Sequence, residues 1–221
     1  MERNVSMEDI SDGRLYGAND MVRADCNGCK GCSECCEKMG DTIILDPYDI
    51  ANICGNLQCS FEQLLGDKIE LGIWQGLIMP HIRISNESGR CGFLNDEGRC
   101  SIHSFRPGFC RLFPLGRFYE EDGSFKYFLQ IHECTMPNKS KVKVKNWIGI
   151  SELSANTEFI EQWHGFTKKI IAAAQNLDDT SMKTLNMYVL KTFYMNTIAI
   201  EHFYEEFSMR LSKAMSDLGI D

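Results

Sequence analysis

A run of eleven residues near the N-terminus, CNGCKGCSECC (26–36), contains five cysteines. Thiols at this density form disulfides, bind a metal, carry out redox chemistry or pack in a core, and each outcome constrains the fold differently. The chain has 11 cysteines, an odd number. A disulfide framework would leave one of them unpaired and would be reduced in the cytosol. Metal coordination is therefore the leading interpretation.

The overall composition is that of an ordinary soluble globular protein. Hydrophobic residues make up 43% and charged residues 24% of the 221 residues, as in typical folded domains. The acidic start lacks the basic and apolar segments of a secretory signal, which predicts a cytoplasmic protein. A net charge of −8 argues against binding to nucleic acid or to anionic membranes, and the apolar runs are too short to span a bilayer.

A change in composition after about residue 140 predicts two parts within an α+β fold. The first is a small, loop-rich cysteine-cluster metal-binding domain over residues 21–140, with a few short helices and strands, and it contains every cysteine. The second, over residues 146–221, is a C-terminal antiparallel helical pair. Residues 1–20 are expected to form a flexible N-terminal tail.

Short helices in the cysteine region are indicated by their capping residues. The segment from Asp46 to Gly55 predicts a helix, because Asp46 can cap it, Pro47 suits its first position and Gly55 can end it. Ser60 can cap a second short helix over residues 61–67.

Strands are indicated by short apolar runs between turn-forming residues. Residues 77–85 and 125–131 predict strands, and Pro80 favours an edge position for the first. Residues 138–145 have alternating lysines, which is typical of a solvated strand or a linker.

The C-terminal region has a helical repeat. Apolar residues from Phe159 to Ala174 recur at steps of three and four. After a cap at Asp178 or Asp179, a longer stripe runs from Met182 to Leu218, and its ten steps cover 36 residues, a mean of 3.6. Its one polar member, Asn196, indicates either a kink or a buried polar contact. This pattern predicts packing between two antiparallel helices or against a protein partner.

The first cysteine group has the spacing C-x2-C-x2-C-C and consists of Cys29, Cys32, Cys35 and Cys36. A C-x2-C turn brings two sulfurs to one ion, and neighbouring glycines supply the backbone freedom that such turns need. Closely packed thiolates repel one another unless a cation is bound. The spacing therefore predicts a metal site.

A second cysteine group lies among turn-forming residues and consists of Cys91, Cys100, Cys110 and Cys134. Cysteines that alternate with turn-forming residues are typical of loops that fold back around one centre. The eight thiols together could form two tetrahedral zinc sites. They could equally form one [4Fe–4S] cluster, with four thiols left for another metal or for structure.

Three motifs carry a resemblance to a known family: C-x2-C-x2-C-C, C-x-F-L followed by G-x-C-S-I-H, and R-P-x-x-C-R-x-F-P. Together they resemble the YkgJ-type cysteine-cluster family, whose members are described as zinc- or iron-chelating or as iron–sulfur proteins. The resemblance implies that all eight cysteines of the two groups are metal ligands. A related cluster occurs in flagellin lysine N-methylases, which use S-adenosylmethionine.

The remaining cysteines are weaker candidates. Cys26 lies three residues before the motif and competes with the first group for a place in the ligand set. Cys54 falls on the apolar face of its expected helix, which favours a buried hydrophobic role over a ligand role. Cys59 lies in an expected loop and is left open.

Two histidines and two arginines lie close to motif cysteines. His103 and His132 are candidates for coordination, for support of the ligands or for plain surface positions. Arg106 and Arg111 flank Cys110, where they could donate hydrogen bonds to thiolates or form salt bridges with surface acids.

Adjacent Cys35 and Cys36 point in different directions, so their joint binding to one zinc ion would be strained. The ligation pattern therefore favours an iron–sulfur cluster over Zn²⁺. We expect this cluster to have a structural, redox or sensory role. We also expect the C-terminal helices to bind a protein partner. The alternatives are a zinc-stabilised interaction module and a protein-modifying enzyme related to the flagellin methylases. Against an enzyme, the sequence contains no G-x-G-x-x-G after a strand, no P-loop and no H-E-x-x-H.

Overall fold

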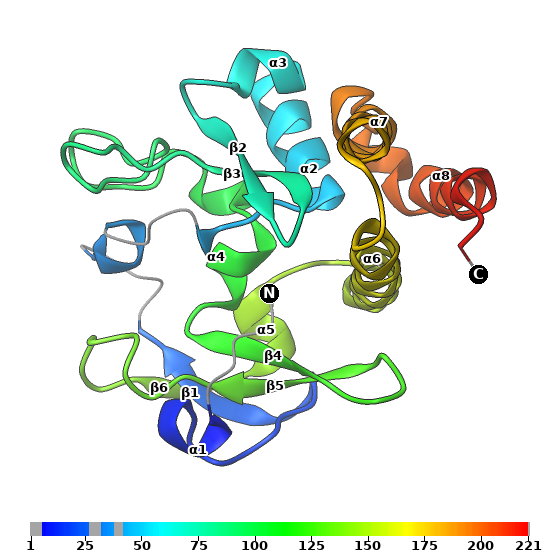
Figure 1. Cartoon of the computed structure of the whole chain (residues 1–221). Helices are drawn as coiled ribbons and strands as arrows, with labels where there is room; N and C mark the ends of the chain where they lie inside the picture. The colour runs from blue at the N-terminus through cyan, green and yellow to red at the C-terminus, as the bar shows by residue number, and fades with distance from the viewer. Residues whose placement is uncertain (1–5, 27–31, 38–41, 221) are drawn as a thin grey trace.

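The computed structural model describes residues 6–26, 32–37 and 42–220, and in this part of the chain helices surround small antiparallel sheets (Figure 1). The helices are α1 (Met7–Ile10), α2 (Pro47–Leu57), α3 (Phe61–Leu64), α4 (Gly108–Leu112), α5 (Val144–Ile148), α6 (Leu153–Ala174), α7 (Asp179–Leu190) and α8 (Phe203–Leu218). The strands are β1 (Met21–Asp25), β2 (Ile69–Trp74), β3 (Leu77–Ile82), β4 (Leu115–Tyr119), β5 (Phe125–Leu129) and β6 (Ser140–Lys143). They pair as β1–β6, β2–β3 and β4–β5. The predicted α+β class with C-terminal helices is confirmed.

The N-terminus of α2 forms as the sequence predicts. The backbone N–H of Asp49 donates to Asp46 Oδ1 at 2.8 Å, and the N–H of Asp46 donates to Asp49 Oδ2 at 3.3 Å. This reciprocal capping box satisfies two N–H groups that would otherwise be unpaired at the helix start. The predicted end at Gly55 is wrong, because the helix continues to Leu57 and ends where Gln58 adopts a left-handed conformation with φ 54°.

The short elements that follow are also shorter than predicted. Ser60 caps α3, but Leu65 is already extended, so the helix has four residues. Strand β3 stops at Ile82, three residues before the predicted end, and its Pro80 lies opposite Leu71 of β2. Strand β5 likewise ends at Leu129.

The lysine-rich segment before α5 forms strand β6, which pairs with β1. Val142 of β6 lies opposite Val22 of β1. The sequence leaves open whether this segment is a strand or a linker. In the structure its residues 140–143 form a strand.

The second C-terminal helix is interrupted, contrary to the continuous stripe in the sequence. Helix α7 passes into a π-helical turn at Lys191–Met195, and Asn196 leaves the helical conformation with φ −86° and ψ 69°. The chain forms a 3₁₀ turn at Ile200–His202 and resumes an α-helix at Phe203. The Nη1 of Arg210 donates to Thr192 O at 2.7 Å and to the carbonyl of Asn196, which satisfies acceptors freed by the break.

Two hydrophobic clusters form the core. The larger cluster joins α2, β2 and β3 to α6, α7 and α8. Its fully buried Tyr194 donates from its hydroxyl to Leu45 O at 3.2 Å. Aromatic rings connect α6 with α8, and the ring centroids of Phe159 and Phe207 are 4.7 Å apart. The C-terminal helices therefore share a core with α2 and its neighbours.

The smaller cluster lies between β1, α4, β4, β5 and α5 and receives Tyr16 from the N-terminal segment. Tyr16 pairs through its backbone with Tyr127 of β5, at 2.7 and 2.9 Å. The predicted boundaries of the tail, of the cysteine-cluster domain and of the helical region stay predictions.

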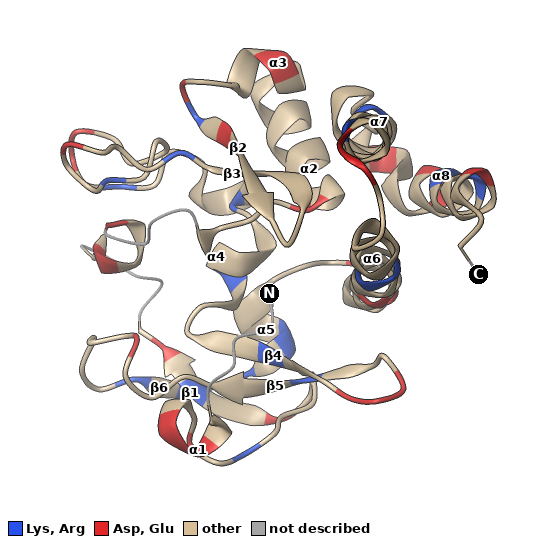
Figure 2. Ribbon diagram, in the orientation of Figure 1, with Lys and Arg blue, Asp and Glu red and all other residues tan. Residues whose placement is uncertain are grey.

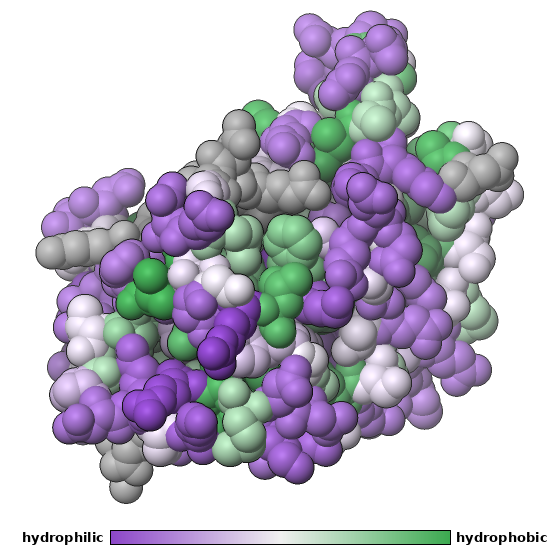
Figure 3. Space-filling view, turned by 90° about the horizontal axis from the view of Figure 1, so that it is seen from below, coloured by the Kyte–Doolittle hydropathy of each residue, from purple (hydrophilic) through white to green (hydrophobic). Residues whose placement is uncertain are grey.

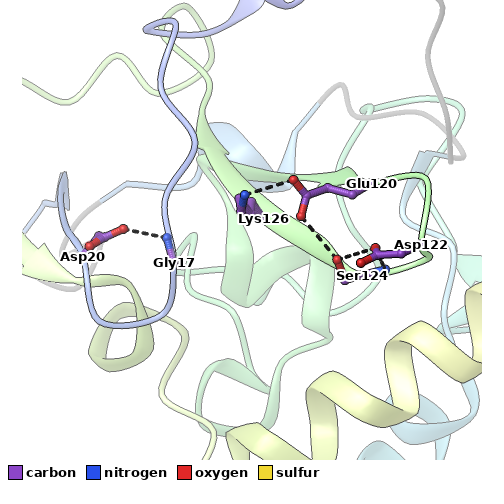
Figure 4. Close-up of polar contacts among 6 residues, drawn as sticks. All are labelled: Gly17, Asp20, Glu120, Asp122, Ser124 and Lys126. Atoms are coloured by element: carbon purple, nitrogen blue, oxygen red, sulfur yellow. Dashed lines mark hydrogen bonds and ion pairs between the residues drawn. The ribbon is translucent and has the colours of Figure 1, made fainter.

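The hairpin between β4 and β5 is closed by polar contacts (Figure 4). Lys126 Nζ lies 2.9 Å from Glu120 Oε1. At the tip, the backbone N–H and the hydroxyl of Ser124 both donate to Asp122 Oδ1, at 2.9 and 2.7 Å. These contacts hold the register of two strands that also form a wall of the site described below.

Charged residues occur on most elements, with acidic residues on α1 and basic ones on α4 and α5 (Figure 2). Seen from below, most of the surface is hydrophilic, and the hydrophobic residues form small groups (Figure 3). Within the described residues, no helix is both long and apolar enough to cross a membrane.

Candidate metal centre

The cysteines are carried by loops and short turns. Cys35 and Cys36 lie in a 3₁₀ turn at Glu34–Cys36, and Cys110 lies on α4. The other candidates follow strands: Cys26 comes after β1, Cys91 and Cys100 after β3, and Cys134 after β5. Cys29 lies outside the described residues.

Five thiols from three separate segments are neighbours, and we call them the five-thiol cluster: Cys35, Cys36, Cys91, Cys100 and Cys110. The sulfurs of Cys35 and Cys36 are 3.9 Å apart. The backbone N–H of Cys91 donates to Cys36 O at 2.8 Å, which fixes the 3₁₀ turn against the loop after β3. All five side chains line one cavity.

A second set of thiols lies around Cys134, which is in electrostatic contact with Cys26 and Cys32. Lys139 Nζ donates to Cys134 O at 2.6 Å and holds this loop. The C-x2-C-x2-C-C run thus contacts both sets: its last two cysteines lie with the second sequence group, whereas Cys32 is in electrostatic contact with Cys134 and also lines the cavity of the five-thiol cluster.

Protonation in the five-thiol cluster is uneven. The thiol of Cys36 hydrogen-bonds to Cys35 and lowers the pKa of Cys35 to about 7, with a further contribution from Arg106. Cys36 retains the proton, so its own pKa is raised. Burial raises the pKa of Cys91, Cys100 and Cys110. In the absence of a cation most of these sulfurs are neutral thiols, and a metal ion must displace their protons in order to bind.

Backbone amides support several of the sulfurs. The N–H of Phe93 donates to Cys91 Sγ at 3.4 Å. The amides two residues beyond Cys100 and Cys134 donate to those sulfurs in the same way. Such N–H···S hydrogen bonds stabilise the thiolate form, and they tune the properties of thiolate-bound metal centres.

Arg106 supplies positive charge next to the cluster. Its guanidinium lowers the pKa of both Cys35 and Cys100 electrostatically. Its Nη1 also lies 2.6 Å from His103 Nε2. Arg111 has a different role, because its Nε donates to the backbone carbonyl of Arg106 at 3.0 Å. Arg106 therefore acts on Cys35 and Cys100, whereas Arg111 is in electrostatic contact with Cys110.

The two candidate histidines differ in position. His103 lines the cavity, where burial and Arg106 lower its pKa. A lowered pKa leaves the imidazole neutral at physiological pH, which is the form that binds metals. His132 is exposed.

A buried pair of carboxyl groups, Asp46 and Asp49, is in electrostatic contact with the cluster through Asp49 and Cys110, and sequence reasoning identified only Asp46, as a helix cap. Asp49 is 3% exposed and accepts a hydrogen bond from the backbone N–H of Gly108 at 2.7 Å. Burial raises the pKa of Asp46 to about 6 and that of Asp49 well above its ordinary value.

A small void of about 10 Å³ adjoins this carboxyl pair and is also lined by Arg106 and Arg117. It has room for about one water molecule. The buried Nε atoms of both arginines lack a hydrogen-bond partner among the described residues, so a water here would be well bound.

Cys54 and Cys59 lie outside the cavity lining. Cys54 is 5% exposed on α2, the position that helical periodicity predicts. Its thiol is hydrogen-bonded to that of Cys59, and burial raises its pKa to about 12. Cys54 belongs to the larger hydrophobic cluster, and Cys59 packs against that cluster.

The donor set fits a thiolate metal centre in its chemistry. Over residues 6–26, 32–37 and 42–220, however, no three His, Cys, Asp or Glu side chains are arranged as a metal-ion site. The sulfurs of the five-thiol cluster are neighbours without forming a closed coordination sphere, so binding requires side-chain rotations. Sulfur donors, N–H···S bonds and an adjacent guanidinium are all properties that zinc–thiolate and iron–sulfur sites share.

Comparison with known families agrees with this chemistry. The family model CxxCxxCC, described as "putative zinc- or iron-chelating domain", matches residues 28–140. The chain belongs to the CxxCxxCC family. The matched range includes both cysteine groups and excludes Cys26 and the C-terminal helices. No curated protein matches the chain, and neither does any solved structure.

Proposed function

We propose that this CxxCxxCC protein holds an iron–sulfur cluster of the [4Fe–4S] type at the five-thiol cluster, with a structural, redox or sensory role in the cytoplasm. The observation that carries the proposal is that the five thiols, with Cys32 beside them, line a single cavity of about 540 Å³. Five neighbouring sulfurs are enough to supply the four thiolates that a [4Fe–4S] cluster takes. A cavity of this size also offers room for a group larger than a single ion.

The ligands would come from the eight cysteines Cys29, Cys32, Cys35, Cys36, Cys91, Cys100, Cys110 and Cys134. The five-thiol cluster would hold the main centre. Cys32 and Cys134 would either bind a second metal or stabilise the loops around the main centre. When bound, the cluster supplies an electron-transfer centre and a cross-link between distant loops. Arg106 would offset part of its negative charge, and the backbone amides would donate to its sulfurs.

A zinc centre is the alternative, and one distance favours it. Two thiolates bound to the same tetrahedral zinc ion lie about 3.8 Å apart, given Zn–S bonds of about 2.3 Å. The sulfurs of Cys35 and Cys36 are separated by 3.9 Å. On this alternative the centre is closed and structural, and the protein is an interaction module.

A protein partner would bind on the C-terminal helices. Exposed methionines support this part of the proposal: Met209 of α8 is 62% exposed and Met187 of α7 is 47% exposed. Methionine is flexible and polarisable, and it is common at surfaces that bind other proteins.

The ligand assignment is tested by metal analysis of alanine variants. Cys100→Ala and Cys110→Ala should each lose at least half of the bound metal, while Cys54→Ala should bind as much as the wild-type protein. Cys54 is the matched control because it is buried in the same region without lining the cavity. Equal metal content in all four proteins would contradict the assignment.

A further inference from the structure

Two thiols that do not line the cavity of the five-thiol cluster are in contact with each other. Cys54 lies near the end of α2, and Cys59 follows shortly after that helix. Their side chains are hydrogen-bonded, and both are free thiols in this structure. The proposed metal centre gives this pair no role.

The turn at the end of α2 brings the two cysteines together. The backbone N–H of Cys59 donates to Cys54 O at 3.1 Å, and Gln58 adopts a left-handed conformation with φ 54°. A turn closed in this way is a Schellman motif, in which the side chains of the first and last residues often touch. Here both of those positions hold a cysteine. Residues kept close by a backbone bond, with their thiols in contact, have the arrangement that a disulfide requires.

The two sulfurs differ in exposure. Cys54 is 5% exposed and belongs to the larger hydrophobic cluster, and burial raises its pKa to about 12. Cys59 is half-buried and lies between the exposed residues Gln58 and Ser60. A small oxidant therefore reaches Cys59 first. Cys54 lies behind Cys59 and retains its proton until a neighbouring group takes it.

We propose that Cys54 and Cys59 form a reversible disulfide when the protein meets hydrogen peroxide. In the first step the Cys59 sulfur, as its thiolate, attacks one peroxide oxygen and the O–O bond breaks. The other oxygen takes up the proton that the thiol lost and leaves as water, so that Cys59 becomes a sulfenic acid.

In the second step the Cys54 sulfur attacks the sulfur of Cys59 and the S–O bond breaks. The oxygen leaves as a second water with the proton of Cys54. The two thiols together lose two electrons, and the peroxide gains them. In a reducing compartment such a disulfide is transient, as is usual for disulfides that sense oxidants.

The pair lies where α2 meets the segment between α7 and α8. The Cys54 side chain is hydrogen-bonded to Thr197, and a Cβ added at Gly55 would lie 3.5 Å from Ile200 Cγ2. Oxidation therefore changes a contact of the segment that links the two C-terminal helices. The inference goes beyond the proposed function and does not depend on the metal centre.

Digestion with trypsin separates the pair from every other cysteine. Residues 39–68 follow a lysine, end at Lys68 and include Cys54 and Cys59 as their only cysteines. The purified protein with its bound metal is exposed to hydrogen peroxide, alkylated with iodoacetamide under denaturing conditions and then digested. Without peroxide, both cysteines of this peptide should be alkylated.

After peroxide, neither cysteine should be alkylated, and the peptide should be lighter by two hydrogen atoms than its unlabelled reduced form. Dithiothreitol added before the alkylation should restore both alkyl groups. The proposal would be overturned by a peptide that keeps both alkyl groups, by one that is joined to a different cysteine peptide, or by sulfinic acid formation without the disulfide.

Single substitutions test the order of the two steps. In Cys54→Ala, Cys59 should stop at the sulfenic acid, which dimedone traps. In Cys59→Ala, the buried Cys54 should stay unmodified. Oxidation of Cys54 in that variant as fast as in the wild-type protein would contradict the order. Metal content measured before the peroxide treatment tests the metal centre separately, because neither cysteine is a proposed metal ligand.

Discussion

The carboxylate of Asp49 accepts a hydrogen bond from the backbone N–H of Gly108 at 2.7 Å and so joins α2 to the first residue of α4. Cys110 follows two residues later in the same short helix. Through this contact the cap of one helix also positions a candidate metal ligand, although the two residues are 59 positions apart in the chain.

The first prediction concerns this link. Asp49→Ala leaves the Gly108 N–H unpaired in a buried site and removes half of the capping box, so it should cost about 2–3 kcal/mol of unfolding free energy. It should also lower metal content, because α4 loses its anchor. Asp49→Asn keeps an oxygen acceptor and should be milder in both respects. Denaturant unfolding and metal analysis of the same samples measure the two effects.

The matched control is Ser60→Ala. Ser60 caps α3 with the same reciprocal capping box, but α3 carries no cysteine. The substitution should cost about 1 kcal/mol and leave the metal content unchanged. If both substitutions reduced metal binding in proportion to stability, Asp49 would have no specific role.

The second prediction concerns pH. The pKa of Asp46 is raised to about 6 by burial, from an unfolded value of about 3.9, so the folded chain holds its proton more tightly than the unfolded chain does. This contribution to stability is fully present below about pH 4 and is lost as the pH rises through about 6. Asp46→Asn removes the titration and retains a capping side chain. The stability of this variant relative to the wild-type protein should therefore rise between about pH 4.5 and pH 7.5.

Denaturant unfolding of both proteins at several pH values measures that difference directly, because effects common to both chains cancel. Asp217→Asn provides a control, since hydrogen bonds from Lys213 and Tyr188 lower the pKa of Asp217, so its stability relative to wild type should stay constant above about pH 5 and change only at lower pH. A pH-independent difference between Asp46→Asn and wild type would show that burial does not perturb Asp46.

The third prediction concerns the break between α7 and α8. Arg210 donates to backbone carbonyls of Thr192 and Asn196. Arg210→Met keeps much of the side-chain volume but leaves those acceptors unpaired, so it should cost about 1–3 kcal/mol without changing the metal content. Lys213→Met on the exposed face of α8 should change neither quantity, because its pair with Asp217 is exposed. Equal stability of the two variants would rule out a role for Arg210 at the break.

Several elements could be predicted because their signals are local. The cap at Asp46, the proline at the first position of α2 and the apolar repeat of α6 each depend on residues a few positions apart. Periodicity alone does not reveal the break at Asn196, because apolar residues continue at the helical spacing on both sides of it, and only the polar side chain indicates a kink as one of two readings. The apolar pattern indicates which face of a helix is buried, but it does not indicate whether the backbone remains helical throughout.

The grouping of the cysteines depends on contacts between distant segments. The spacing predicts a metal-binding region, but the bond from the Cys91 N–H to Cys36 O joins residues whose proximity no local pattern encodes. The same holds for the neighbourhood of Cys32 and Cys134. The cavity and the position of Arg117 likewise follow from the packing of the β4–β5 hairpin, which sequence spacing does not define.

Anaerobic purification from iron-replete cells tests for the iron–sulfur centre. We predict a brown protein with broad visible absorption from sulfur-to-iron charge transfer, containing iron and acid-labile sulfide in matching amounts. Aerobic samples are not a substitute, because the same thiolates accept Zn²⁺, which binds a given site more tightly than Fe²⁺. A colourless anaerobic protein with stoichiometric zinc and no sulfide would contradict the claim and would establish the closed zinc centre instead.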